Sequence, residues 1–489
     1  MKQTSLEEIR EIAKSGDYRL IPVCREILSD IRTPIEVLRA LQNVSDHCFL
    51  LESVEDSRQW GRYTFLGYDP QMELICRDHV LTINAGSSFQ VKTDHPGTYI
   101  KQILEENRAP RIDGMPSLTG GLVGFFSYDY IRYGEPSLKL KENAEEGFAD
   151  MDLMLFDKMI AFDNLKQKMV LIANMRTDSI EVNYNKACLE LDEMERIVRH
   201  GAPKENPGGK LLEELKPELS EEEFCRKVDR IKYHIHEGDI FQLVYSNPMK
   251  ARYTGSLLDM YRVLRTTNPS PYMFYFSGST ELAGASPETL VKVEGRTVRT
   301  FPLAGTRPRG KTYEEDQALE AELLADEKER AEHNMLVDLG RNDLGKLCAF
   351  GSVEVERYMS VERYSHVMHI GSAVKGTLRE DVEAIDAVDA VLPAGTLSGA
   401  PKIRACELID ELEGDRRGIY GGAVGYVDFT GNLDVCIAIR LAYKKDDVVY
   451  VRSGAGIVAD SVPEKEYQEC INKAMAVVNA LKQAEEVDE

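Results

Sequence analysis

The chain has 489 residues, of which 43% are apolar and 29% charged, a composition typical of a soluble globular protein with a large core. Its 60 Lys and Arg against 83 Asp and Glu leave a formal charge of −23, which argues against a nucleic-acid or anionic membrane partner, because both need a basic surface. The first residues are acidic where a signal peptide would be apolar, and no apolar run approaches the roughly 20 residues that span a membrane. We therefore expect a cytoplasmic protein.

The nine cysteines are scattered without CxxC spacing, which indicates reduced thiols used in packing rather than a disulfide framework or a nucleophile. The histidines are poorly spaced for a metal site. His234 and His236 diverge in an expected helix, and His366 and His369 point to opposite faces of an expected strand.

The clearest break in the pattern lies at residues 201–217, where Pro, Gly and charged residues interrupt any packing face. It separates residues 1–200, which are rich in short strand-like runs, from residues 218–489, in which helices and strands are mixed. Because the mixing shows no strict alternation, an α+β fold or a complex α/β layer fold is favoured over a doubly wound sheet.

The C-terminal region begins with a predicted helix after Ser220, because Ser220 and Glu223 form a capping box and apolar residues recur at helical spacing up to Gly238. A strand over 240–246 and a helix over 256–265 are expected next. The run LVKVEGRTVRTF predicts a hairpin that turns at Glu294-Gly295.

A long acidic helix is predicted from Tyr313 to Leu339. At about 100° per residue, Glu329, Glu332, Leu336 and Leu339 fall in one arc of about 80°, so two carboxylates point the same way as the apolar stripe. The same periodicity also fits a solvated acidic face beside the stripe. If the carboxylates are buried they need a cation, and ligands that are all oxygen suit Mg²⁺.

The last helix is predicted to start at Ser461, with Pro463 just inside it, and to continue towards Gln483. Glu466 and Glu469 flank its apolar face. Such acids are usually solvated, but the two Glu-x-x-Glu pairs together could hold one metal ion, with water and a ligand carboxylate completing an octahedron.

Arg440 lies in the apolar run VCIAIRLAY, which is typical of a strand. A buried guanidinium needs an anion, and the sequence leaves open whether this is an internal acid or a bound substrate. The glycines of Gly454-Ala455-Gly456 would let backbone N–H groups approach a carboxylate, although most such glycine pairs are only turns.

Residues 305–312, GTRPRGKT, match the phosphate-loop pattern Gly-x4-Gly-Lys-Ser/Thr. That pattern requires a preceding strand and a helix that starts at the Lys, within a parallel βαβ unit. Here a broken hairpin arm precedes the match, and no apolar strand ending in Asp follows at a suitable distance. We treat the match as coincidental and keep an ATP-binding NTPase that depends on Lys311 as an alternative.

The C-terminal region contains, in this order, the segments GASPETLV, FPLAGTRPRG, EHNMLVDLGRNDLGKL, VMHIGSAVKG, LPAGTLSGAPKIRA, YGGAVGY, DVCIAIR and RSGAGIVADSVPEKEYQE. The set resembles the chorismate-utilising enzymes and, among them, the large synthase components of anthranilate synthases, over roughly residues 224–480. LLESVEDSRQWGRYTFLG and GGLVGFFSYDYIR extend the resemblance into the N-terminal region. It implies one large α/β sandwich of two interleaved layers, with residues 201–217 as a linker within a shared core.

The resemblance implies a role for each matching residue. Mg²⁺ would be held by Glu332 and Glu469, with Glu329 and Glu466 in support. Chorismate would be bound by Gly305, Thr306, Tyr420, Arg440, Gly454, Ala455 and Gly456. The general acid that protonates the departing C4 hydroxyl would be Glu288. The polar groups at the reacting ring would be Thr396 and His369, with His369 transferring a proton as pyruvate leaves.

Two positions distinguish the sister activities. Relatives that add water to chorismate have a Lys where this chain has Gln242, and ammonia, which is already a nucleophile, needs no such base. Aminodeoxychorismate synthases have a covalently acting Lys where this chain has Ala304. The resemblance therefore implies amination to anthranilate, with aminodeoxychorismate synthase as the nearest alternative.

Two further segments resemble the tryptophan feedback site of these components. LLES ends at Ser53 in the N-terminal region, and NPSPYM supplies Asn268, Pro271, Tyr272 and Met273. A strand end and a Pro-rich turn are the plain structural alternative for each segment. A non-catalytic, tryptophan-binding regulatory subunit is a further functional alternative.

No cysteine lies in a Gly-x-Cys-x-Gly setting, so the chain has no recognisable glutaminase. The resemblance then implies that ammonia comes from a separate glutamine amidotransferase subunit. The expected reaction converts chorismate and ammonia to anthranilate and pyruvate, the first committed step of tryptophan biosynthesis, with Mg²⁺ as cofactor.

Overall fold

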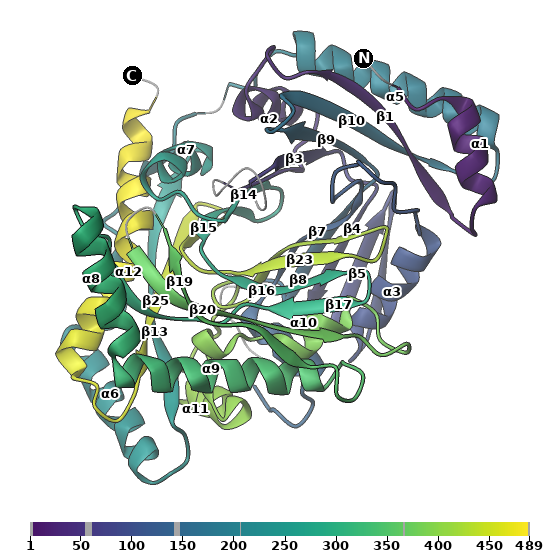
Figure 1. The fold of residues 1–489 in the computed structure, drawn as a ribbon. Coiled ribbons are helices and arrows are strands. Elements are labelled where there is room, and N and C mark those ends of the chain that lie inside the picture. The colour runs from purple at the N-terminus through teal and green to yellow at the C-terminus, as the bar shows by residue number, and fades with distance from the viewer. Residues whose placement is uncertain (1–2, 54–60, 141–146, 206, 365–366, 488–489) are drawn as a thin grey trace.

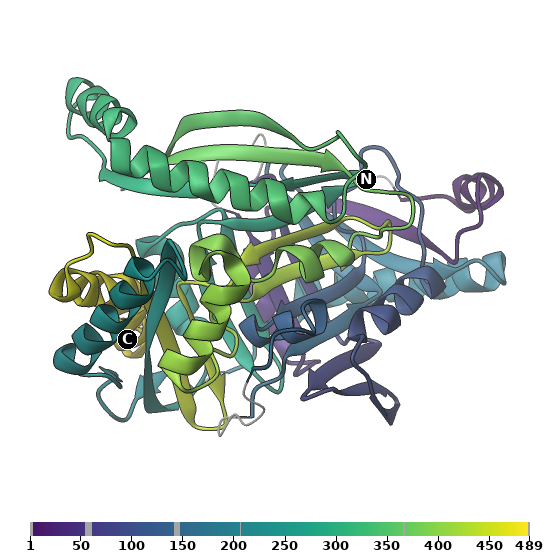
Figure 2. The same ribbon diagram turned by 90° about the horizontal axis from the view of Figure 1, so that it is seen from below.

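Two antiparallel β-sheets lie face to face in the computed structural model, and helices cover their outer faces (Figures 1 and 2). The structure describes residues 3–53, 61–140, 147–205, 207–364 and 367–487. The mixed helix and strand content confirms the predicted α+β class.

Among the described residues, the first sheet has 13 strands. In spatial order they are β1 (Leu20–Leu28), β10 (Lys168–Arg176), β9 (Lys158–Asp163), β3 (Tyr63–Tyr68), β2 (Cys48–Glu52), β14 (Tyr272–Ser277), β15 (Glu281–Ser286), β24 (Leu441–Lys445), β25 (Val448–Ile457), β13 (Gln242–Thr254) and β11 (Lys210–Leu211), with β12 (Lys216–Pro217) and β21 (Gly399–Ala400) also paired to β13.

The second sheet has 12 strands in the described part of the chain. Their order is β18 (Leu303–Pro308), β20 (Val367–Thr377), β17 (Thr297–Thr300), β16 (Thr289–Glu294), β23 (Leu433–Ile437), β22 (Ala423–Asp428), β7 (Gly121–Phe126), β8 (Met151–Phe156), β4 (Met72–Arg77), β5 (Val80–Ala85) and β6 (Ser87–Lys92), with β19 (Glu354–Arg363) also paired to β20.

The central strands are apolar on both faces because both faces are buried. In β2, Phe49 packs into the core between the sheets, whereas Cys48 and Leu50 pack outward under helices. The same period of two recurs in β14, where Phe274 points inward and Met273 points outward. These strands therefore appear in the sequence as continuous hydrophobic runs rather than as alternating ones.

Long helices complete the outer layers. On the first sheet lie α1 (Leu6–Lys14), α2 (Pro34–Gln42), α5 (Ile180–His200), α7 (Leu258–Thr267) and α12 (Pro463–Gln483). On the second sheet lie α3 (Pro96–Glu106), α9 (Glu327–Gly345) and α10 (Asp386–Val391), with α8 (Tyr313–Ala325) beside β18. A further cluster joins α6 (Glu221–His236) and α11 (Lys402–Glu413) to the ends of β13 and β25.

Both sheets combine strands from either side of residues 201–217, which gives the interleaved layers that the resemblance implied. Two short strands within that stretch, β11 and β12, pair with β13 and attach it to the first sheet. The division of the chain into regions 1–200 and 218–489 stays a prediction.

Several predicted elements are confirmed with changed bounds. Ser220 and Glu223 form the expected capping box, and β16 and β17 form the expected hairpin around Gly295. The strand predicted at 240–246 extends to Thr254, and the last helix begins at Pro463 after Val462 rather than at Ser461.

The single acidic helix predicted over residues 313–339 is wrong. It consists of two helices, α8 and α9, that meet at Asp326. Asp326 has an extended backbone, and its carboxylate accepts hydrogen bonds from the backbone N–H groups of Lys328 and Glu329. The sequence signal for this N-cap, an Asp one residue before an acidic first turn, lay inside the helical pattern.

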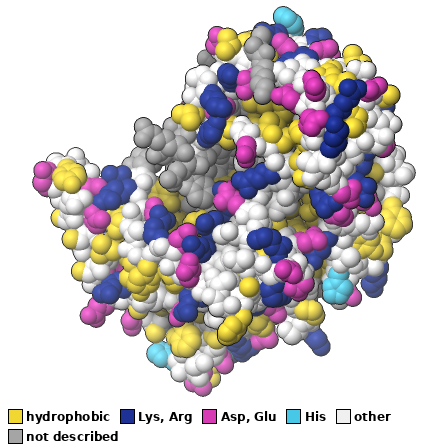
Figure 3. Space-filling model, turned by 45° about the vertical axis from the view of Figure 1, so that its right-hand side comes forward, with side chains coloured by type: hydrophobic (Ala, Val, Ile, Leu, Met, Phe, Trp, Pro, Cys, Tyr) yellow, Lys and Arg dark blue, Asp and Glu magenta, His cyan; other side chains and the backbone are white. Residues whose placement is uncertain are grey.

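The surface carries charges of both signs. On the face shown in Figure 3, Lys and Arg side chains are interspersed with Asp and Glu. Of the helices in the described part of the chain, none combines enough length with enough apolar residues to pass through a bilayer.

Candidate functional site

The predicted catalytic residues gather where the chain passes twice from one sheet to the other. The chain leaves β15 for β16 at Glu288, and it leaves β23 for β24 at Arg440. The two crossings run side by side, because β15 pairs with β24 and β16 pairs with β23. Backbone hydrogen bonds join them: Ala285 N donates to Arg440 O over 3.1 Å, and Ile437 N donates to Glu288 O over 2.9 Å.

The prediction that Arg440 lies within one apolar strand is therefore wrong. The run is split between two strands of different sheets, and Arg440 itself adopts a left-handed backbone with φ of 51°. Left-handed geometry is uncommon for a residue with a side chain and is often retained at functional sites.

The Arg440 guanidinium is partly buried and has no anion beside it among the described side chains. No carboxylate among the described residues forms an ion pair with it, and burial lowers its pKa, an effect that the charge of Glu288 only partly offsets. An unpaired buried cation costs several kcal/mol. This observation favours a bound anion over the internal salt bridge that the sequence left open.

Glu288 is a buried carboxyl group beside that cation. Burial raises the pKa of Glu288 to about 8, while the hydrogen bond from Thr396 and the charge of Arg440 act in the opposite direction. Thr396 Oγ1 donates to Glu288 Oε1 over 3.1 Å. At neutral pH the carboxyl is protonated, which is the state that a general acid needs.

The glycines 454–456 lie in strand β25 and not in a turn. Pairing of β25 with β24 ends at Val451, so from residue 452 the edge that faces β24 has no strand partner in the described part of the chain. Because alternate residues of a strand direct their N–H groups to each edge, part of this glycine segment offers free N–H groups near Arg440.

Tyr420 reaches this segment because residue 454 is a glycine. A Cβ atom there would lie 3.0 Å from the Tyr420 hydroxyl and 2.7 Å from the Tyr245 carbonyl oxygen. The Arg417 guanidinium lies 5.9 Å from the centre of the Tyr420 ring, and Arg417 is itself neutralised by Glu413. Tyr420 therefore lies beside a buried ion pair, neither member of which was found by sequence reasoning.

His369 lies on β20, on the opposite side of the site. Its Nδ1 atom is 2.8 Å from the Gly305 carbonyl oxygen and 3.1 Å from Thr306 Oγ1. Only a protonated Nδ1 can donate to a carbonyl, which leaves Nε2 able to accept a proton. Burial lowers the pKa of His369, so the ring is neutral at pH 7. Gly305 has φ of 65°, which explains the glycine at this irregular point of β18.

The carboxylates predicted on the acidic helix lie on α9, so the argument from the helix face survives the break at Asp326. Burial raises the pKa of Glu332, and the neighbouring charge of Glu329 adds to the effect. Gln242 Nε2 donates to Glu332 Oε1 over 3.2 Å, and no described cation forms an ion pair with Glu332. Arg307 Nη1 lies 3.4 Å from Glu329 Oε1.

The second carboxylate pair lies on α12, near the first. Burial raises the pKa of Glu466, and Lys328 of α9 counteracts this, which places the two helix ends within electrostatic reach. Glu469 pairs with Lys473 over 2.7 Å. Sequence reasoning missed Lys473, whose charge also acts on Glu288 and His369. The sequence signal that could have predicted this ion pair was a Lys one helical turn after Glu469 in the same helix.

The described residues contain no group of three His, Cys, Asp or Glu side chains close enough to hold a metal ion. The donor chemistry nevertheless fits a hard cation. All four predicted ligands are carboxylates, and Glu332 is a partly buried carboxylate that forms no ion pair with a described cation.

The phosphate-loop match does not adopt a phosphate loop. Residues 303–308 form strand β18, which is antiparallel to β20, and the helix after Thr312 belongs to no parallel βαβ unit. Arg309 pairs with Asp316 instead of facing a cavity. The structural context that the NTPase alternative requires is therefore missing from these described elements.

A cavity of about 300 Å³ lies between the sheets and brings together four of the five residues predicted to bind tryptophan: Ser53, Pro271, Tyr272 and Met273. Ser53 Oγ is buried and has no hydrogen-bond partner among the described residues. Asn268 does not line the cavity. It ends α7, and its amide donates to Ser270 Oγ over 3.4 Å.

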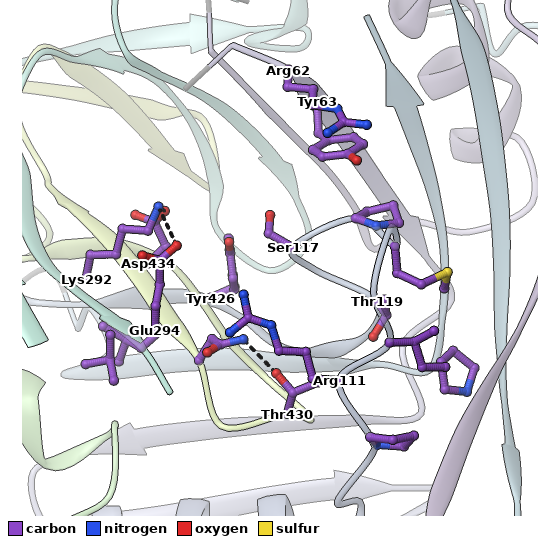
Figure 4. A pocket seen from close by; sticks show the side chains of 18 residues that line it. Arg62, Tyr63, Arg111, Ser117, Thr119, Lys292, Glu294, Tyr426, Thr430 and Asp434 are labelled. Carbon is purple, nitrogen blue, oxygen red and sulfur yellow. Dashed lines mark hydrogen bonds and ion pairs between the residues drawn. The ribbon is translucent and has the colours of Figure 1, made fainter. Parts of the chain in front are cut away.

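A smaller chamber of about 190 Å³ adjoins this cavity (Figure 4). The two share Arg62, Tyr63, Ser117, Lys292, Glu294, Tyr426 and Asp434, so they form one continuous cleft. Lys292 Nζ lies 3.4 Å from Glu294 Oε1 and 3.5 Å from Asp434 Oδ2, which makes this part of the wall polar.

The cavity and the catalytic crossing are adjacent. The Tyr272 hydroxyl lies 2.9 Å from Thr289 Oγ1 and donates to Asp434 Oδ1 over 2.8 Å. Thr289 directly follows Glu288, and Cys436, which lines the cavity, directly precedes Ile437, whose N–H holds the Glu288 carbonyl. The cavity and the catalytic crossing are therefore neighbours, and residues of β16 and β23 lie between them.

Comparisons with known proteins agree with this arrangement. A family profile described as chorismate binding enzyme matches residues 46–479. The anthranilate synthase component 1 of Acetivibrio thermocellus is 44% identical, with 99% of each chain covered, and that of Aquifex aeolicus is 43% identical, again with 99% of each covered.

Solved structures show the same relationship. Anthranilate synthase component I from Streptococcus pneumoniae superposes with a TM-score of 0.75 at 36% identity, covering 92% of this chain and 99% of that one. The menaquinone-specific isochorismate synthase from Escherichia coli, at 20% identity and a TM-score of 0.69 over 98% and 99% of the chains, shares the fold. The chain belongs to the chorismate-binding enzyme family and, within it, to the anthranilate synthase component 1 proteins.

Proposed function

We propose that this chain converts chorismate and ammonia to anthranilate and pyruvate. The observation that carries the proposal is the buried Glu288 carboxyl, which accepts a hydrogen bond from Thr396, next to the partly buried Arg440, which forms no ion pair with a described carboxylate. A proton donor and a fixed cation are what a dianionic substrate with a poor hydroxyl leaving group requires.

The first half of the reaction replaces the C4 hydroxyl. Arg440 and the free edge of β25 bind a carboxylate of chorismate and orient the ring. Ammonia forms a bond to C2, the ring double bonds shift, and the C4–O bond breaks. Glu288 supplies the proton with which the hydroxyl leaves as water, and Thr396 holds its carboxyl in position.

The second half removes pyruvate. A base takes the proton from C2, the bond between C3 and the enolpyruvyl oxygen breaks, and the ring becomes aromatic. The free Nε2 of His369 is suited to this proton transfer, because its Nδ1–H is committed to the Gly305 carbonyl. The enolpyruvate then takes up a proton and becomes pyruvate.

Magnesium is the proposed cofactor, held by Glu332 and Glu469 with Glu329 and Glu466 in support. When bound, it would supply positive charge next to the ring carboxylate. Two features of Glu332 support this proposal: its carboxylate is partly buried, and the hydrogen bond donated by Gln242 orients one of its oxygens.

Ammonia is proposed to come from a separate glutamine amidotransferase subunit. Burial raises the pKa of most thiols in this chain. It raises the pKa of Cys48 to about 12, and it also raises that of Cys470. Protonated, buried thiols cannot serve as the nucleophile of a glutaminase. The chain and its partner are proposed to act in the cytoplasm.

Product identification tests the proposed reaction. With chorismate, Mg²⁺ and ammonium, chromatography with mass detection should find anthranilate and pyruvate in equal amounts. Accumulation of a product with the amino group at C4 in place of the hydroxyl, with the enolpyruvyl group retained and no pyruvate released, would instead support the sister activity, against which Ala304 argues.

Tryptophan is proposed to bind the 300 Å³ cavity and inhibit the reaction. The apolar lining from Pro271 and Met273 suits an indole, and Ser53 offers a buried hydroxyl without a partner. Tyr272 lines the cavity and contacts Thr289, which directly follows Glu288. Tryptophan bound in the cavity can therefore affect the catalytic acid through this contact. Through Ser53, the N-terminal region of residues 1–200 is proposed to contribute to the tryptophan feedback site.

Replacing Ser53 by Ala should weaken inhibition by tryptophan about 2- to 13-fold, because one hydrogen bond contributes about 0.5–1.5 kcal/mol. The uninhibited rate should stay close to the parent value. Inhibition curves for the parent, Ser53→Ala and the exposed control Ser88→Ala measure this. An inhibition constant of Ser53→Ala equal to that of Ser88→Ala would remove Ser53 from the site.

A further inference from the structure

The Ser372 hydroxyl joins three elements next to the catalytic site. Ser372 is fully buried on β20. Its Oγ lies 2.6 Å from His333 Nε2 on α9, and it accepts a hydrogen bond from Met359 N on β19 over 2.9 Å. His333 is also fully buried. Helix α9 lies along these two strands in Figure 2.

Met359 needs this hydroxyl because β19 is irregular there. The register between β19 and β20 shifts between Arg357 and Ser360, and Met359 adopts a left-handed backbone with φ of 50°. A bulged residue is left out of the strand ladder, so its N–H needs another acceptor. The adjoining Tyr358 donates its hydroxyl to Asn334 Oδ1, a second contact between the bulge and α9.

These contacts fix two functional groups relative to each other. His333 and Asn334 directly follow Glu332, the partly buried carboxylate proposed to hold the metal. Ser372 lies three residues after His369, on the same strand. A single hydroxyl therefore ties the turn of α9 that carries Glu332 to the strand that carries His369.

We propose that Ser372, with His333, is a positioning residue that sets the Glu332 carboxylate for binding a divalent cation. The proposal rests on the proposed magnesium site. Simple core packing would not require a polar side chain here, since an unpaired buried hydroxyl is destabilising and a methyl group would fill most of the same space. Ser372 has both of its contacts satisfied by groups that border the site.

The test measures cation binding directly. Mn²⁺ binding to the full chain is followed by electron paramagnetic resonance, without substrate and without turnover. Ser372→Ala should weaken Mn²⁺ binding at least about tenfold, the range typical when a group that orients a metal ligand is removed. The matched control is Ser360→Ala, which also loses two hydrogen bonds, one within β19 and one from β19 to β20, neither of them to α9.

A second readout separates positioning from stability. Activity titrated with Mg²⁺ should show a raised metal requirement for Ser372→Ala, with much of kcat restored at saturating Mg²⁺. If Ser372 had only a structural role, Ser372→Ala would lower kcat at every Mg²⁺ concentration. Its thermal stability would then fall by about as much as that of Ser360→Ala. Equal Mn²⁺ affinity in the parent and Ser372→Ala would overturn the proposal.

Two further results are distinguishable from equal Mn²⁺ affinity in the parent and Ser372→Ala. A parent chain that binds no Mn²⁺ would overturn the proposed metal site itself, and with it this inference. If Ser372→Ala fails to fold, Tyr358→Phe decides, because Tyr358 is about half exposed and its loss leaves the core intact. Tyr358→Phe should weaken Mn²⁺ binding about two- to fivefold, and an unchanged affinity would contradict the proposal.

Discussion

Replacing Glu332 by Gln is expected to lower Mg²⁺-dependent formation of anthranilate at least about a hundredfold, because a bound metal contributes several kcal/mol of charge stabilisation. The substituted amide keeps the volume of the side chain and can still accept the hydrogen bond from Gln242. It lacks the negative charge that attracts the cation. Steady-state rates over a range of Mg²⁺ concentrations measure the effect.

The control for this prediction is Glu327→Gln, an exposed carboxylate in the first turn of the same helix. Its rate should match that of the parent, and circular dichroism should show that both variants are folded. Activity of Glu332→Gln equal to that of Glu327→Gln would remove Glu332 from the metal site.

Replacing Glu288 by Gln should lower kcat about 10²- to 10⁴-fold, the usual contribution of a general acid. Glutamine has the shape of the protonated carboxyl and can accept the hydrogen bond from Thr396, so the fold should be kept. It cannot give up a proton to the leaving hydroxyl. Single-turnover measurements of chorismate consumption test this step.

The pKa of Glu288 also predicts a pH profile. With a pKa of about 8, the carboxyl is protonated below pH 8 and loses its proton above it. Since the protonated form is the active acid, the parent rate should fall as the pH rises through this value. The residual rate of Glu288→Gln should lack this alkaline limb. An identical limb in both proteins would assign the titration to another group.

Local chemistry in the sequence predicted much of the fold. The capping box at Ser220 and the turn at Gly295 depend on neighbouring residues alone, and both are confirmed. The shared direction of Glu329 and Glu332 depends only on helical periodicity, so it survived an error in the helix boundary. The Asp326 N-cap was missed because acidic residues on both sides of it are good helix formers.

Features that depend on long-range pairing could not be predicted. The run around Arg440 is apolar throughout, and only the partner strands reveal that it is divided between two sheets. The bulge at Met359 and its hydroxyl acceptor on Ser372 likewise have no local signal. The family resemblance supplied roles for Arg440 and Glu288, whereas the crossing that brings them together came from the structure.

Anthranilate formation by the chain alone can be followed by fluorescence. The purified full chain is mixed with chorismate, ammonium and Mg²⁺, and anthranilate fluorescence is followed with and without a metal chelator. Our account predicts steady formation of anthranilate without any partner subunit, and its loss when the chelator is added. No fluorescent product, even with a glutamine amidotransferase partner and glutamine present, would contradict the assignment of this site to anthranilate formation.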